Sequence, residues 1–381
     1  MKQNIIILSP AHPLRGGIAS SSERLAIALQ QAGDEVEIIS FSLQYPGFLF
    51  PGKTQYTDDP APEGLKIHTL INSVNPFNWL KTGLRLKSMQ PDLIIVRFWM
   101  PFMGPALGTI LRLAKSNGKT KVIALADNII PHEKRPGDYL LTKYFCGSVD
   151  SFLVMSKSVG EDVWKFTTEK PVVFSPHPIY DNYGALVDRQ TALQHLGLDT
   201  AYRYLLFFGF IRDYKGLDLL LEAMADDSLE HLPIRLIVAG EYYGNQEKYE
   251  SLIAKLGLSQ KLILHNSFIP HEEVKYFFGA ADLVVQPYKT ATQSGITQLA
   301  YHFEVPMLVT NVGGLPEIVA DGEMGYVVEP DSREVAKAIL DFYDNNRYLT
   351  FLDGVRQNKK RFDWERMVEK IKGLFFGRAP S

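Results

Sequence analysis

Two cations in one short loop are the residues of this chain best placed to do chemistry. Arg212 and Lys215 lie three residues apart, after an apolar run at 204–208 that predicts a buried strand ending at Gly209. A helical pattern begins at Gly216. In an open α/β sheet, ligands bind at the carboxyl ends of the strands, where the next helix points its positive end. Two cations there suit a diphosphate that leaves during a reaction; the alternative is a surface loop with two solvated charges.

A second loop of this kind lies further along the chain. The apolar run 283–286 predicts another buried strand, and a new helical pattern follows it. The residues that open this helix are Ser294, Gly295, Ile296, Thr297 and Gln298. The first N–H groups of a helix have no partner within it, so they are donors for an anion. Two such loops after strands, in one half of the chain, are hard to explain by packing alone.

The elements that must position these loops alternate along the whole chain. Short apolar runs typical of buried parallel strands occur at 93–96, 122–126, 152–155 and 172–174. The first strand is expected at 5–8, followed by a loop that ends in Gly16 and Gly17 and by an amphipathic helix. Both halves of the chain therefore open with strand, glycine loop and helix, which predicts an α/β fold with doubly wound parallel sheets.

Composition limits the class of protein. At roughly 150 residues per domain, 381 residues of which 46% are apolar predict two or three domains. A net charge of −3 gives no sign of nucleic-acid binding. The single cysteine, Cys146, allows no internal disulfide and fits a reducing compartment. No secretory signal is visible and the longest apolar stretch, 98–111, contains two prolines, so we expect a cytoplasmic protein.

The order of these motifs resembles a known family. FGFIRDYKG is followed by VAGE at 238–241, SFIP at 267–270, the SGITQ helix and VGGLPEI, as in the donor half of GT-B retaining glycosyltransferases of family 4, the glycosyl transferases group 1. The resemblance implies two Rossmann-like lobes facing each other across a cleft. Residues 1–180, with a returning helix at 362–378, would bind the acceptor, and residues 181–361 would bind a nucleotide-diphosphate sugar. The implied reaction is hexosyl transfer with retention at the anomeric carbon.

Family resemblance also implies roles for single residues. Arg212 and Lys215 would stabilise the leaving diphosphate, while Asp127 and His132, after the strand at 122–126, would contact the sugar or phosphate. A helix cap and an ordinary histidine between the lobes are the alternatives for Asp127 and His132. The implied donor-binding set is Gly16, Gly17, Gly209, Arg212, Lys215, Glu241, Ser294, Gly295, Ile296, Thr297 and Gln298.

Three departures matter. The family arginine after Gly209 is replaced by Phe210, and the two family glutamates of the donor loop are replaced by Ala291 and Leu299. No Asp-x-Asp occurs in the sequence, so we expect a metal-independent enzyme without a cofactor. Loss of the glutamates leaves two further classes open. One is a nucleotide-sugar epimerase of the same fold, and the other is an inert subunit that only binds sugar nucleotides.

The acceptor side is less informative. We expect a saccharide or a lipid-linked saccharide as acceptor, on the basis of the resemblance. The helical pattern at 75–89 carries Phe77, Leu80 and Leu84 in register, with cations at Lys81, Arg85 and Lys87. Such a helix either makes a weak peripheral contact with the inner face of an anionic membrane or is a solvated helix face, and three cations favour the latter.

Overall fold

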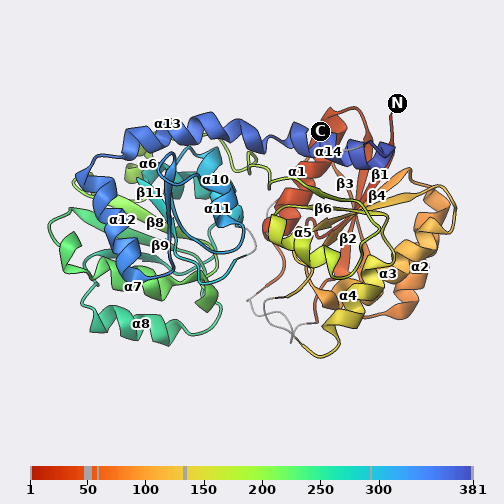
Figure 1. Cartoon of the computed structure of the whole chain (residues 1–381), viewed down its shortest axis with the longest axis horizontal. Helices are drawn as coiled ribbons and strands as arrows, with labels where there is room; N and C mark the ends of the chain where they lie inside the picture. The colour runs from red at the N-terminus through yellow and green to blue at the C-terminus, as the bar shows by residue number, and fades with distance from the viewer. Residues whose placement is uncertain (1, 47–53, 58–59, 132–134, 292–293, 379–381) are drawn as a thin grey trace. The chain divides into compact units, whose positions relative to one another are not determined.

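The computed structural model describes the chain except for residues 1, 47–53, 58–59, 132–134, 292–293 and 379–381. It divides into two compact units (Figure 1). Unit 1 comprises Met1–Pro176 and Asp363–Ser381, and unit 2 comprises His177–Phe362. Each unit is a parallel sheet with helices on both faces, as the alternation of strand and helix patterns in the sequence predicts.

Unit 1 is built on seven strands among its described residues, in the order β3-β2-β1-β4-β5-β6-β7. The strands are β1 (Asn4–Leu8), β2 (Glu35–Leu43), β3 (Lys66–Asn72), β4 (Leu93–Phe98), β5 (Lys121–Ala126), β6 (Ser151–Val154) and β7 (Val172–Phe174). The helices are α1 (Gly17–Gln31), α2 (Pro76–Met89), α3 (Gly104–Lys115), α4 (Asp138–Cys146), α5 (Lys157–Trp164) and α14 (Trp364–Phe376).

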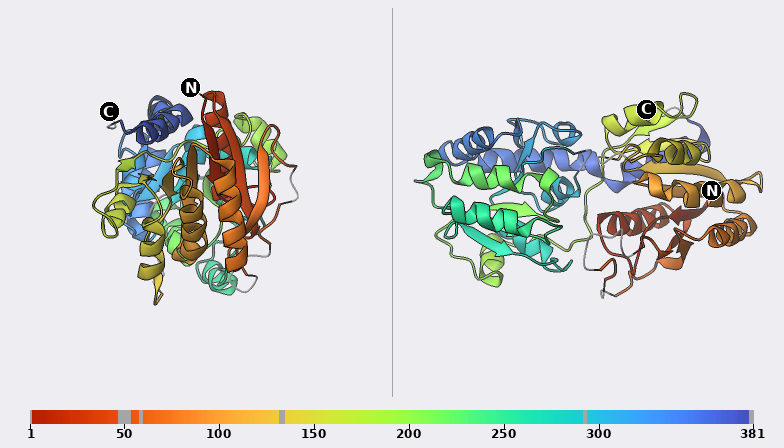
Figure 2. Two further views of the ribbon diagram at one scale, coloured as in Figure 1. Left: turned by 90° about the vertical axis from the view of Figure 1, so that its right-hand side faces the viewer. Right: turned by 90° about the horizontal axis from the view of Figure 1, so that it is seen from below.

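Alternation along the strands gives unit 1 two apolar layers. Ile5 and Ile7 of β1 face the layer that contains α1 and α14, while Ile6 and Leu8 face the layer that contains α2, α3, α4 and α5. The last helix, α14, therefore packs against α1 in unit 1 although it is far away in sequence (Figures 1 and 2). The buried residues that anchor it are Trp364, Met367, Val368 and Ile371.

Unit 2 is built on six strands among its described residues, in the order β10-β9-β8-β11-β12-β13. The strands are β8 (Arg203–Phe208), β9 (Ile234–Ala239), β10 (Leu262–His265), β11 (Leu283–Gln286), β12 (Met307–Thr310) and β13 (Gly325–Val328). The helices are α6 (Arg189–His195), α7 (Leu217–Met224), α8 (Gln246–Lys255), α9 (Val274–Ala280), α10 (Gly295–His302), α11 (Leu315–Ile318), α12 (Ser332–Asp344) and α13 (Tyr348–Asn358).

The strand order places the loop after β8 beside the loop after β11, the two loops in which the sequence predicts an anion site. β8 lies between β9 and β11. From β8 the chain first adds strands on one side of the sheet, β9 and β10, and then on the other side, β11 to β13, so the strand order reverses at β8. Leu205 and Leu206 of β8 pair with Leu283 and Val284 of β11. The loops that leave the carboxyl ends of these two strands are residues 209–216 (the β8 loop) and residues 287–294 (the β11 loop). A reversal of this kind is where open α/β sheets bind their ligands.

None of the helices in the described part of the chain combines the length and the apolar character that a membrane span requires.

Candidate functional site

Close backbone contacts fix the β8 loop in unit 2. Gly209 has φ +93°, and a Cβ added at Gly240 would lie 2.1 Å from its carbonyl oxygen. Gly216, with φ +67°, packs so tightly that a Cβ there would lie 1.9 Å from the Pro287 carbonyl oxygen. Only glycine fits both the space and the backbone conformation at Gly216. The two loops therefore touch through main chain, and the short helical turn Asp213–Lys215 is held against the β11 loop.

Lys215 is the most unusual charge in this region. Its side chain is buried, and no carboxylate among the described residues pairs with it. A Cβ at Gly209 would lie 3.1 Å from its Nζ atom and 3.3 Å from Cδ1 of Ile296, so the ammonium lies close to the start of α10. Burial lowers the pKa of Lys215 from 10.5 to about 8, and the nearby positive charge of Arg212 adds to the shift. Lys215 is therefore a buried cation without a carboxylate partner among the described residues.

Arg212 supplies a second charge on the same loop. Its guanidinium is exposed and lies 4.9 Å from the ring centroid of Tyr243. Glu241, which the resemblance places in the donor-binding set, is buried, and its carbonyl oxygen accepts a hydrogen bond of 2.9 Å from the Ile211 amide. The main chain after β9 therefore supports the turn from which Arg212 and Lys215 project.

The start of α10 is the third part of the site. Ser294 is the N-cap, and its Oγ atom accepts a hydrogen bond of 3.2 Å from the Ile296 amide. Of the amides at this helix start, that of Ile296 therefore already has an acceptor within the chain. The Thr297 hydroxyl donates to the Ser294 carbonyl oxygen, and the positive end of the helix remains directed at the loop.

The structure shows the surroundings of two further residues of the implied donor-binding set, Gly295 and Gln298. A Cβ on Gly295 would lie 2.7 Å from Cε2 of Tyr180, so packing alone already demands a glycine at this position. Gln298 is fully buried, and neither of its amide atoms has a hydrogen-bond partner among the described residues.

Leu299, which stands where the family has its second glutamate, is a core residue with 3% exposure. Ala291 is half-buried beside the same core.

Unit 1 holds the remaining candidates. Gly16, with φ +117°, caps α1, and Gly17 is the first residue of that helix. Asp127 follows β5. The resemblance implies that its carboxylate contacts the sugar or the phosphate, but in the structure this carboxylate is bound by an arginine. Both oxygens accept hydrogen bonds of 2.7 Å from the guanidinium of Arg97, and both side chains are buried. His132 lies outside the described residues.

Sequence reasoning missed several of the residues that shape these sites. Arg97 reads as an interruption of an apolar strand, yet its Nη1 atom also donates a hydrogen bond of 2.6 Å to Ser21 of α1. Lys289, which follows β11, reads as a solvated loop residue. In the structure its amide donates a hydrogen bond of 2.7 Å to the Tyr214 carbonyl oxygen, and its side chain belongs to a charge network described below. A lone charge within an apolar run is the signal that marks Arg97.

Within the described residues, no group of three or more His, Cys, Asp and Glu side chains converges to hold a metal ion.

Comparison with known proteins shows what unit 2 is similar to. Residues 188–361 match the model of the family described as glycosyl transferases group 1. Unit 2 is therefore similar to group 1 glycosyltransferases over nearly its whole length. This confirms the resemblance inferred from the β8-loop and α10 motifs.

Partial matches to curated proteins agree with the family match. The chain is 27% identical over 214 residues to the D-inositol 3-phosphate glycosyltransferase of Corynebacterium aurimucosum, which covers 54% of this chain and 50% of that protein. It is 27% identical over 274 residues to D-inositol 3-phosphate glycosyltransferase 1 of Catenulispora acidiphila, covering 69% of this chain and 60% of that protein. The matched segments thus span about half to three-fifths of these curated relatives.

Solved structures confirm the GT-B fold of this chain. Sucrose-phosphate synthase from Thermosynechococcus elongatus is similar with a TM-score of 0.76 at 17% identity, covering 99% of each chain. HepE from Anabaena in complex with UDP is similar with a TM-score of 0.73 at 17% identity, covering 99% of this chain and 100% of that one. At this identity the likeness concerns the fold and carries no assignment of substrate.

Proposed function

We propose that this protein transfers a hexose from a nucleoside-diphosphate sugar to a saccharide or lipid-linked saccharide acceptor, with retention at the anomeric carbon and without a metal ion. The observation that carries the proposal is Lys215 of the β8 loop. Its buried ammonium has no carboxylate partner among the described residues and lies close to the start of α10. An uncompensated buried cation is costly for the fold, and an anionic ligand removes that cost. The group 1 family match and a neighbour solved with UDP support a diphosphate as that anion.

The chemistry asked of these residues is charge stabilisation. Cleavage of the bond from the sugar to the diphosphate passes through an oxocarbenium-like state, and negative charge grows on the leaving phosphate. Lys215, Arg212 and the positive end of α10 are already oriented before the reaction begins, so little reorganisation is needed as that charge develops. Metal independence is proposed because these fixed cations supply the charge and because the sequence contains no Asp-x-Asp.

We assign acceptor binding to unit 1 on the basis of the family resemblance. There Asp127 acts as one half of an ion pair with Arg97 and so can fix the end of β5 and, through Ser21, the start of α1. An acid/base role would require Asp127 to exchange a proton while both oxygens bind the guanidinium. This arrangement disfavours the epimerase alternative.

A weak contact with an anionic membrane is part of the same proposal. On α2, Phe77 is 83% exposed and Leu84 is 55% exposed, so an apolar stripe faces outward. The helix carries Lys81, Arg85 and Lys87 and no acidic residue between Pro76 and Met89. Apolar side chains flanked by cations match the interface of an anionic bilayer. Sedimentation with anionic and neutral vesicles tests it, and Phe77→Ser should weaken only the anionic binding. Equal recovery with both vesicle types would leave α2 as a solvated face.

An inert sugar-nucleotide-binding subunit is the second candidate. It is favoured by one observation, namely the core position of Leu299 where the family has a glutamate. Incubation of the protein with a panel of UDP-, ADP-, GDP- and dTDP-sugars separates the candidates. Slow release of free nucleoside diphosphate, accelerated by a saccharide acceptor, supports transfer. Interconversion of the sugar supports an epimerase, and binding without turnover supports the inert subunit.

A further inference from the structure

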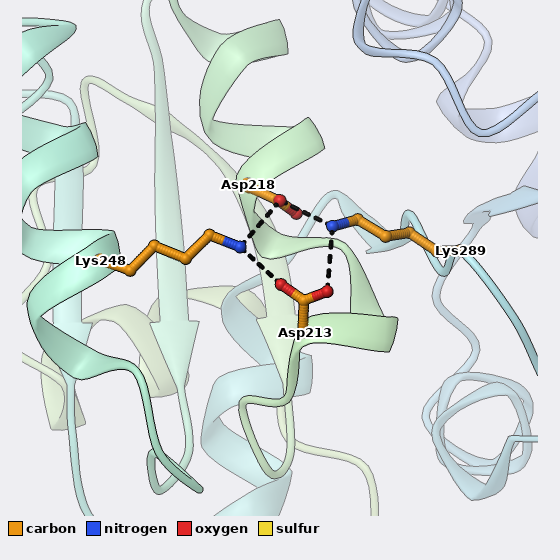
Figure 3. A network of polar contacts seen from close by, with 4 residues as sticks. All are labelled: Asp213, Asp218, Lys248 and Lys289. Atoms are coloured by element: carbon orange, nitrogen blue, oxygen red, sulfur yellow. Dashed lines mark hydrogen bonds and ion pairs between the residues drawn. The ribbon is translucent and has the colours of Figure 1, made fainter. Parts of the chain in front are cut away.

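Two carboxylates and two ammonium groups form a closed ring of alternating charges that includes one residue of the β8 loop (Figure 3). Asp213 of the loop and Asp218 of α7 face Lys248 of α8 and Lys289 of the β11 loop. Lys248 Nζ lies 2.5 Å from Asp213 Oδ1 and 3.3 Å from Asp218 Oδ2. Lys289 Nζ lies 2.7 Å from Asp218 Oδ2 and 3.5 Å from Asp213 Oδ2. Each carboxylate therefore contacts both ammonium groups.

The sequence position of Asp213 is what makes the ring informative. Asp213 directly follows Arg212 and lies two residues before Lys215, the two cations assigned to the diphosphate. A free carboxylate at this point would pair with them or repel the phosphate. In the structure, the Asp213 carboxylate instead contacts the ammonium groups of Lys248 and Lys289. The hydrogen bond from Lys248 lowers the pKa of Asp213, so this carboxylate stays ionised and bound within the ring.

We propose that Lys248 and Lys289 are positioning residues that bind the Asp213 carboxylate and thereby keep Arg212 and Lys215 available for the diphosphate. This inference rests on the proposed function. Lys289 contributes in a second way, because its amide donates to the Tyr214 carbonyl oxygen and joins the two loops. Half of the Asp213 side chain and 44% of the Lys248 side chain are exposed, so the ring adds little to stability. Its effect is on where the negative charge lies.

The test compares calorimetric affinities for UDP, ADP and GDP, using the nucleotide that binds the wild-type protein most tightly. Lys289→Met should weaken binding by about 3- to 10-fold, because it releases one side of Asp213. Adding Asp213→Asn to Lys289→Met should return the affinity to within about 2-fold of the wild type, since the released negative charge is gone. Asp213→Asn alone should tighten binding slightly.

Two controls separate positioning from net charge and from loop rigidity. Lys289→Met combined with Asp218→Asn has the same net charge as the rescuing pair, but it leaves Asp213 charged and should not restore affinity. Lys337→Met removes an exposed ion pair with Glu334 on α12 and should leave affinity unchanged. If Asp213→Asn weakens binding as much as Lys289→Met and the two losses add, the ring is only a structural clamp and the inference is wrong. If the wild-type protein binds none of the three nucleotides, the proposed donor site is wrong as well.

Discussion

Replacing Lys215 by methionine should separate activity from stability. Methionine keeps most of the length and the apolar character of the lysine stem, so the packing beside Gly209 and Ile296 is preserved while the charge is removed. Without the ammonium, the leaving diphosphate loses one preorganised charge, and we expect kcat/KM to fall by roughly 10²-fold or more. Without a ligand, the same change removes a cation that is buried without a counter-charge, and we expect the protein to become more stable.

The size of the stabilisation follows from the pKa of Lys215. A decrease from 10.5 to about 8 means that the folded protein disfavours the ammonium, by about 3 kcal/mol at 1.36 kcal/mol per pKa unit. This is an upper limit, because methionine does not pack perfectly in the same space; we expect a gain of about 1–3 kcal/mol in the free energy of unfolding at neutral pH. For a unit of this size, each kcal/mol raises Tm by about 2–4 °C.

The stability gain should depend on pH with a defined sign. Below pH 8 the lysine is protonated in both the folded and the unfolded chain, so the full penalty is present. Between pH 8 and 10.5 the unfolded chain binds more protons than the folded one, so the wild-type protein regains stability as pH rises. The difference in stability between Lys215→Met and the wild type should therefore shrink across this range.

Denaturant unfolding at pH 7 and pH 9.5, together with nucleotide release from the preferred donor, measures both effects. A folded Lys215→Met protein with unchanged turnover would contradict the catalytic role. A variant that is less stable than the wild type at pH 7 would contradict the claim that Lys215 is an uncompensated buried charge.

Three further changes test other parts of the account. Activity should persist after treatment with EDTA and dialysis, because fixed cations supply the charge; loss on chelation with recovery in Mg²⁺ or Mn²⁺ would show that a metal is needed. Gly295→Ala places a Cβ 2.7 Å from the Tyr180 ring, so its denaturant midpoint should fall by an amount that corresponds to about 1–3 kcal/mol; nucleotide affinity lost at unchanged stability would return the ligand role to Gly295. Asp127→Asn leaves the buried Arg97 guanidinium without its anion, which should cost about 3–5 kcal/mol, and a variant as stable as the wild type would argue against that pair.

Sequence patterns were sufficient to predict β8, α14 and the position of the β8 and β11 loops. The apolar run at 204–208 predicted β8, observed as Arg203–Phe208, because buried parallel strands leave continuous apolar runs. The helix expected from Trp364 is α14, since its stripe of Met367, Val368 and Ile371 can only be buried on one face. Glycines that follow strands marked the loops correctly because close backbone approach and positive φ restrict the residue type.

Charge pairing could not be predicted, because it depends on contacts between segments far apart in the chain. Arg97 lies in β4 and Asp127 follows β5. The residues around Arg97 and those around Asp127 give no indication that the two side chains form an ion pair. The sequence left open whether Lys215 is a ligand-binding cation or a solvated loop charge, and its burial becomes visible only in the folded chain. Gly295 was assigned to a ligand from its place at a helix start, whereas Tyr180, more than a hundred residues away, already explains the glycine.

The most direct test of the central claim is the pKa of the Lys215 side chain itself, with and without nucleotide. Selective ¹³C labelling of lysine and assignment by comparison with Lys215→Met allow the Cε signal to be titrated by NMR. The account predicts a pKa of about 8 in the free protein and a rise toward or above the ordinary value of 10.5 when UDP, or the nucleoside diphosphate that binds, saturates the site. A pKa near 10.5 in the free protein, or one that does not change on nucleotide binding, would show that Lys215 is not the counter-charge of the diphosphate.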